Sequence, residues 1–163
     1  MIERTLVLIK PDGVARSLVG RILQRFEDAG LKIIGMKMQW VDKEFAARHY
    51  TEDITIRRGE RVRNSLIDYL AAGPVIAIAF EGIHSIEIVR KIVGPTEPKA
   101  ALPGTIRGDF AHVSFAYADQ KLIPVKNLIH ASANAQDAES ELKLWFTQKE
   151  LHSYATVHDV HIL

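Results

Sequence analysis

Four apolar runs along the chain predict the strands of one sheet. The first ends at Pro11-Asp12-Gly13, a combination typical of a turn. The third, "PVIAIAFEG", is apolar without alternation, which predicts a central strand covered on both faces. The fourth, "NLIHA", is the shortest and ends on a histidine and a small residue. The predicted strands cover residues 4–10, 31–41, 74–82 and 127–131.

Apolar positions at helical spacing predict helices between and after these strands. Gly30 ends the first helix, and Asp42 and Asn134 are suitable N-caps for two others. Residues 51–61 show no clear period, and residues 95–109 are rich in proline and glycine, which predicts a long functional or disordered loop. The predicted helices cover residues 17–30, 42–50, 62–73, 84–94 and 135–146.

The order of these elements predicts the fold class. Two strand-helix-strand halves favour a four-stranded antiparallel sheet with helices on one face, which is a ferredoxin-like α+β sandwich. No repeat, low-complexity tract or linker interrupts the sequence, so we expect one domain over residues 1–163 with an irregular C-terminal tail at 145–163. This fold hosts many functions, so the function has to be argued from particular residues.

Composition excludes several classes of protein. A net charge of +1 does not indicate a broad basic face for duplex nucleic acid, and the strands lack the aromatic motif of an RNA-recognition module. The absence of cysteine excludes disulfides and thiolate chemistry and fits a cytoplasmic location. The apolar run at the N-terminus is too short to span a membrane and lacks the features of a signal peptide.

Polar residues at the ends of the apolar elements are the candidates for chemistry. His130 ends the last strand beside small residues, and Glu141 lies on the helix that follows, where a carboxylate can fix the tautomer of a nucleophilic imidazole. Taken singly, His130 also fits a core histidine, and the others fit solvated surface groups. Together with His130, a lysine, two arginines and a threonine form the set that a polyphosphate requires: Lys10, Arg90, Thr96 and Arg107.

Two other classes of protein compete with this interpretation. A regulatory protein that binds nucleotide without catalysis would keep the phosphate contacts and lose either His130 or Glu141, and both are present. A metal-binding module is the other alternative, because His152, His158 and His161 lie close together in the tail. Their spacing gives no i, i+4 helical pair and no cysteine accompanies them, so we expect them to be surface residues. The chain also lacks both common glycine-rich phosphate-binding motifs.

Several blocks of sequence resemble the nucleoside diphosphate kinase family over residues 3–146. They are "ERTLVLIKPDGV", "GPVIAIAFEG", "ALPGTIRGDF" and "NLIHASANAQDAESELKLWF", in the order that the family keeps. The resemblance implies transfer of the terminal phosphate of a nucleoside triphosphate to a nucleoside diphosphate, with Mg²⁺, by a ping-pong mechanism through a phosphohistidine. It also implies a homo-oligomer, either a tetramer or a hexamer.

The resemblance also implies roles for individual residues. His130 matches the phosphorylated histidine, Glu141 the glutamate that orients it, and Ser132 the serine beside that glutamate. Asn127 matches the asparagine that meets the ribose hydroxyl, and Tyr50 matches a tyrosine near the phosphohistidine and the lysine. The phosphate contacts match Lys10, Arg90, Thr96 and Arg107. We expect Mg²⁺ to be held mainly by the nucleotide phosphates, without close ligation by Asp12, Glu52 or Asp109.

Two segments depart from the family pattern, and both flank the expected nucleotide cleft. The first is longer than usual after Tyr50, and it places Val62 where most members carry the phenylalanine that stacks on the base. The second is the extended link at residues 111–126. Our hypothesis for the first segment is a lid whose arginines reach the diphosphate: Arg57, Arg58, Arg61 and Arg63.

Overall fold

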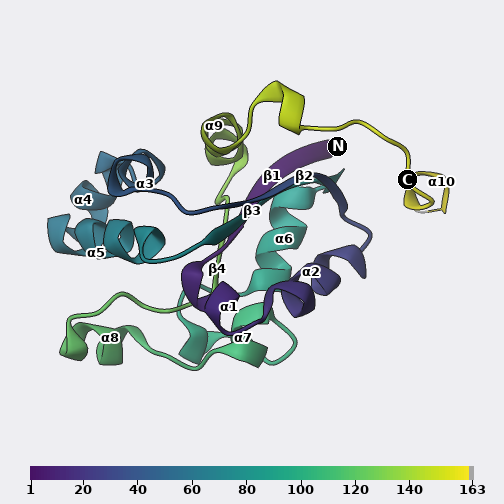
Figure 1. The fold of residues 1–163 in the computed structure, drawn as a ribbon. Coiled ribbons are helices and arrows are strands. Elements are labelled where there is room, and N and C mark those ends of the chain that lie inside the picture. Colours follow the sequence, from purple (N-terminus) through teal and green to yellow (C-terminus); the bar gives the residue numbers. More distant parts are fainter. Residues whose placement is uncertain (162–163) are drawn as a thin grey trace.

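The computed structural model, which describes residues 1–161, contains the predicted sheet (Figure 1). Its strands are β1 (Ile2–Ile9), β2 (Lys32–Gln39), β3 (Val75–Ile83) and β4 (Ile129–Ala131). They lie in the order β2-β3-β1-β4, and every pairing is antiparallel. The α+β class and the ferredoxin-like sheet are therefore confirmed. The expected central strand is confirmed too, because β3 is buried from Val75 to Phe80.

The helices surround this sheet and are more numerous than the sequence pattern predicts. Two short 3-10 helices, Pro98–Ala100 and Gln148–Glu150, lie among them. The α-helices are α1 (Pro11–Ala15), α2 (Val19–Glu27), α3 (Lys43–His49), α4 (Glu52–Arg58), α5 (Glu60–Ala71), α6 (Ser85–Val93), α7 (Ile106–Phe110), α8 (Phe115–Lys121), α9 (Ala135–Trp145) and α10 (His158–His161).

Helices cover both faces of the sheet, so the prediction of helices on one face was wrong. Leu6 and Leu8 of β1 belong to a core with residues of α3, α5 and α9. Val7 and Ile9 belong to a second core with residues of α2 and α6. All four side chains are fully buried, and a strand that is apolar on both faces has to be covered on both.

The short helices are the elements that the pattern missed. The predicted turn at Pro11 is the first turn of α1, where a proline without an N–H is well suited. Residues 51–61 hold α4, which Gly59 separates from α5 with a φ of 90°. The extended link at 111–126 holds α8, and the loop at 95–109 holds a 3-10 turn and the start of α7. Elements this short contain too few turns to show a period.

Two of the predicted helix caps are present. The Asp42 carboxylate accepts a hydrogen bond from the Phe45 amide at 2.8 Å, and the Asn134 side chain accepts one from the Asp137 amide at 2.8 Å. These caps fix where α3 and α9 begin, and these two helices carry side chains of the candidate site.

The C-terminal tail packs along the edge strand β2. The His152 amide donates to the Ile34 carbonyl at 2.7 Å, and the Tyr154 hydroxyl donates to the Ile33 carbonyl at 2.5 Å. The tail is thus only partly irregular, and residues 162 and 163, with which the predicted tail ends, lie outside the described residues. Over residues 1–161, no helix has the length and apolar character needed to cross a membrane.

Candidate active site

The predicted site residues converge on one cavity of about 870 Å³. The cavity lies between the carboxyl end of β1, the helices α3, α4 and α5, and the segment that carries α8. Ser132 is the exception, since it is fully buried behind Glu141 and does not reach the cavity. The predicted residues that line the cavity are Lys10, Tyr50, Val62, Arg90, Thr96, Arg107, Asn127, His130 and Glu141.

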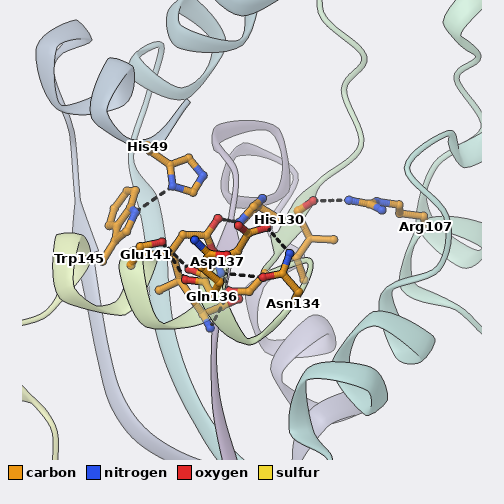
Figure 2. A network of polar contacts seen from close by, with 12 residues as sticks. His49, Arg107, His130, Asn134, Gln136, Asp137, Glu141 and Trp145 are labelled. Atoms are coloured by element: carbon orange, nitrogen blue, oxygen red, sulfur yellow. Dashed lines mark hydrogen bonds and ion pairs between the residues drawn. The ribbon is translucent and has the colours of Figure 1, made fainter. Parts of the chain in front are cut away.

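Strand β4 aims His130 at this cavity. His130 pairs with Leu8 of β1, so the two side chains share the sheet face that α3 and α9 cover. Its Nε2 lies 2.9 Å from Oε1 of Glu141, as Figure 2 shows. Within residues 1–161, its Nδ1 has no hydrogen-bond partner, so this nitrogen is the one that can attack a ligand.

Glu141 is held as a carboxylate on α9. The Ser132 hydroxyl donates to its Oε2 at 2.6 Å, while its other oxygen meets His130. Burial by itself would raise the pKa of Glu141, but the His130 imidazole and the Ser132 hydroxyl outweigh it and lower the pKa below its usual range. An ionised Glu141 accepts a hydrogen bond from the Nε2–H of His130, which leaves the lone pair on Nδ1.

His49 is a site residue that the sequence analysis missed. Its ring meets the His130 ring edge-on, with centroids 4.6 Å apart, and the Trp145 indole N–H donates to its Nδ1 at 3.3 Å. Burial, and then the nearby His130, lower the pKa of His49 to about 3, so it is neutral at working pH. Figure 2 shows His49 and Trp145 on one side of His130 and Arg107 on the other. In the sequence, the position of His49 one turn after Phe45 on α3 was the feature that indicated burial.

One group in the described part of the chain has the ligand types of a metal site. His49, His130 and Glu141 offer atoms within 4.8 Å of one another, although these atoms are already engaged with one another and with Trp145. The tail histidines form no comparable group within residues 1–161. These contacts therefore fit an imidazole that is held by hydrogen bonds better than they fit a metal site.

The cationic end of the cavity is built around Lys10, directly after β1. The Lys10 ammonium donates to the Asn127 side-chain oxygen at 2.9 Å, and the Asn127 amide donates to the Thr96 carbonyl at 2.9 Å. Burial, and then repulsion from the Arg107 guanidinium, lower the pKa of Lys10 to about 7. An anion bound here would raise the pKa of Lys10 again, because a nearby negative charge favours the protonated lysine.

Arg107 is buried and holds three backbone carbonyls. Its guanidinium donates to Asn127 at 3.2 Å, to Gly94 at 2.9 Å and to Ile129 at 2.7 Å. Since an arginine has five N–H donors, about two remain for a ligand. Arg107 therefore joins β4 to the loop after α6 and also presents charge to the cavity.

A left-handed residue separates Asn127 from His130. Leu128 has a φ of 70°, and the Ile129 amide donates to the Asn127 carbonyl at 2.8 Å, which closes a three-residue turn. Because of this turn, Leu128 and Ile129 both pack in the core beside α2 and α6. The polar residues on either side line the cavity.

The remaining phosphate candidates lie at the exposed rim. Arg90 is in the last turn of α6 and Thr96 is in the loop after it, and both are exposed. Gly108, in contrast, does not serve a ligand. A Cβ at Gly108 would lie 2.0 Å from the Leu102 carbonyl oxygen, so glycine is needed for the loop's own packing. Gly104 has a φ of 91°, and neither glycine is among the described residues that line the cavity.

The arginines of the predicted lid divide into two groups. Arg57, Arg58 and Arg61 line the cavity. Arg63 faces the other way, since its guanidinium donates to the Tyr50 carbonyl at 2.7 Å and pairs with Glu52 at 2.8 Å.

Tyr50 lies at the start of this segment with its hydroxyl buried. The hydroxyl has no hydrogen-bond partner among the residues that the structure describes. Burial, and then the Glu141 carboxylate, raise the pKa of Tyr50, so the phenol keeps its proton and can donate it to a ligand.

The chain is similar to known proteins over nearly its whole length. A sequence model described as nucleoside diphosphate kinase matches residues 3–151. The nucleoside diphosphate kinase of Borreliella burgdorferi is 48% identical over 155 residues, covering 94% of this chain and 93% of the relative. That of Pyrococcus furiosus is 45% identical, with 97% and 91% covered.

Solved structures agree with the sequence relatives. A transition-state mimic of the Borrelia burgdorferi enzyme with vanadate and ADP superposes with a TM-score of 0.96 at 46% identity, covering 98% of this chain and 96% of that one. A halophilic enzyme from Halobacterium salinarum in complex with CDP gives a TM-score of 0.84 at 34% identity, covering 100% and 99%.

Proposed function

Because the chain belongs to the nucleoside diphosphate kinase family, a family of phosphotransferases, we propose that it transfers phosphate between nucleotides through His130. The observation that carries the proposal is the contact of 2.9 Å between His130 Nε2 and Glu141. A carboxylate at this distance favours the tautomer with the proton on Nε2, which would leave Nδ1 free toward the cavity.

The reaction needs two displacements at phosphorus. In the first, the Nδ1 lone pair attacks the terminal phosphorus of a nucleoside triphosphate; a P–N bond forms, the P–O bond breaks, and the diphosphate leaves. In the second, a terminal oxygen of another nucleoside diphosphate attacks the same phosphorus and breaks the P–N bond. Glu141 stabilises the positive imidazole between the two steps, and Ser132 keeps Glu141 in place.

The phosphates of the substrate would meet the cationic end of the cavity. Lys10 and Arg107 are buried cations there, and Arg90 and Thr96 add a second guanidinium and a hydroxyl at the rim. Developing negative charge on the transferred phosphoryl group is stabilised most by such fixed cations, because they need no reorganisation during the reaction. Asn127 would meet the ribose, and Val62 would cover the base.

The acidic side chains fit a magnesium ion that is held by the nucleotide. Asp53 lines the cavity but is paired with Arg57, and Asp119 is paired with Arg61. Asp109 is likewise engaged, by Arg25. We therefore propose that Mg²⁺ is ligated by phosphate oxygens and water, where it would neutralise phosphate charge. Neither Asp12, Glu52 nor Asp109 is among the described residues that line the cavity.

The proposal extends to the setting of the enzyme. Its substrates would be nucleoside tri- and diphosphates, as the ADP and CDP in the solved relatives support. We also propose a cytoplasmic homo-oligomer, either a tetramer or a hexamer, in line with the family resemblance. Large apolar side chains exposed on and beside the edge strand β2 are consistent with assembly: Met36, Met38 and Trp40.

Radiolabelled ATP tests the central step. After incubation with ATP labelled at the terminal phosphate, the parent protein should carry label that acid releases and alkali does not, as for a P–N bond. ADP or GDP should then remove the label as the triphosphate. His152→Ala, at an exposed tail histidine, should label as the parent does, and His130→Ala should not label. A parent protein that binds ATP without becoming labelled would be a non-catalytic nucleotide-binding protein.

A further inference from the structure

The extended link at 111–126 supplies an apolar wall of the cavity. Leu122 and Ile123 lie side by side in the sequence of this wall and are 74% and 41% exposed. The cavity thus combines basic side chains with an apolar wall, which complement the phosphates and the base of a nucleotide. The apolar lining residues of the link are Phe115, Ala118, Leu122, Ile123, Pro124 and Val125.

Phe115 is held firmly in this wall. It is the first residue of α8, and the Ser114 hydroxyl caps the helix by accepting from the Tyr117 amide at 3.1 Å. The Phe115 amide donates to the Glu97 carboxylate at 2.8 Å. Glu97 directly follows Thr96, so the backbone of Phe115 is tied to the loop that carries Thr96.

The same helix faces the lid. The Arg58 guanidinium lies 5.2 Å from the centre of the Phe115 ring, and Arg61 pairs with Asp119 at 3.4 Å. In Figure 1, α8 extends below α5 at the end of the molecule where α4 lies. The lid and the link therefore close on the cavity from two sides.

We propose that Phe115 is the aromatic ring on which the base of the bound nucleotide packs. This inference rests on the proposed function. Val62 lines the cavity but has no π face, and the other aromatic rings among the described lining residues are His49, Tyr50 and His130, all at the catalytic end. A base whose phosphates reach Lys10 would extend along the cavity to the apolar wall of the link, where Phe115 offers the ring. A ring reads the base face and not its edge, so it favours large purines over pyrimidines.

Binding measurements on position 115 test this assignment. Dissociation constants for ADP, GDP, UDP and inorganic pyrophosphate are measured by calorimetry for the parent, Phe115→Leu and Phe115→Trp. Loss of the ring in Phe115→Leu should weaken ADP and GDP about tenfold and UDP less, as expected for a base stacked on an aromatic ring. Pyrophosphate, which has no base, should bind as tightly as before, and Phe115→Trp should restore the ADP affinity. Tyr117→Ala, on the same helix and outside the cavity lining, should change nothing.

Two results would overturn the assignment. Equal weakening of ADP and pyrophosphate would mean that Phe115 serves only to hold Arg58 against the phosphates. Unchanged affinity for every ligand in Phe115→Leu would place the base elsewhere. Either result is separable from a failure of the proposed function, because labelling of His130 by saturating ATP does not depend on the base contact.

Discussion

Raising the pH from about 7 to about 9 should weaken nucleotide binding by removing the proton of Lys10. The Lys10 ammonium is buried beside Arg107, and these two effects, burial first, bring its pKa down to about 7. A diphosphate favours the charged lysine, so the bound form keeps the proton. At a pH below the pKa of Lys10 in the free protein, the lysine already carries its proton. At a pH above this pKa, each binding event has to take up a proton.

The size of the effect follows from this pKa. The apparent dissociation constant is inversely proportional to the fraction of free protein that carries the proton, which is about half at pH 7 and about one in a hundred at pH 9. The affinity for ADP should therefore fall about fiftyfold over this range. Tyr50 and Arg107 should keep their protons over most of this range, because the pKa of Tyr50 is raised and the pKa of Arg107 is about 10.

Calorimetry in paired buffers measures both the affinity and the proton. At pH 8, titration with ADP in two buffers of different ionisation heat should report uptake of about 0.9 proton per ligand. Lys10→Arg should show no such uptake, because a guanidinium stays protonated, whereas Lys91→Arg, at an exposed position of α6, should behave as the parent. If the affinity for ADP changes by less than about twofold from pH 7 to pH 9, and no proton is taken up, the reasoning is refuted.

Three further outcomes test other parts of the site. His130→Ala should abolish phosphate transfer with an unchanged unfolding transition, and more than a few per cent residual activity would contradict its role. Alanine at Arg57, Arg58 and Arg61 together should raise KM alike for several nucleoside diphosphates and flatten the salt dependence; binding of ADP and GDP as in the parent would rule out the lid. Gly108→Ala should lower the free energy of unfolding by about 1–3 kcal/mol, since its Cβ meets a backbone carbonyl, and an unchanged denaturation midpoint would contradict this.

Sequence reasoning located the sheet and the residues of the candidate site for different reasons. Long apolar runs correctly predict strands, and long helical periods correctly predict helices, because burial of a whole face dominates the free energy of these elements. Lys10 and His130 stood out because a charged or titratable side chain at the end of a buried strand needs a partner. Glu141 was the candidate partner of His130 because it lies on the helix that follows this strand, and the family resemblance gave it the same role; the 2.9 Å contact now gives the pairing a physical basis.

The failures have physical causes too. The helix α8 is seven residues long, and caps and tertiary contacts stabilise it without a visible period, so Phe115 could not be placed. His49 was overlooked because a buried neutral imidazole looks like any core residue until its neighbour is known to be Trp145.

Arg107 also has a consequence for the solution behaviour of the protein. β4 is the outermost strand on its side of the sheet, and the Ile129 carbonyl on its outer edge accepts from Arg107, as does the nearby Asn127 carbonyl. An uncovered strand edge is a template on which another chain can pair, and here a guanidinium occupies that edge. Loss of Arg107 should therefore promote self-association as well as weaken binding, so a charge that lines the cavity also protects the sheet edge against aggregation.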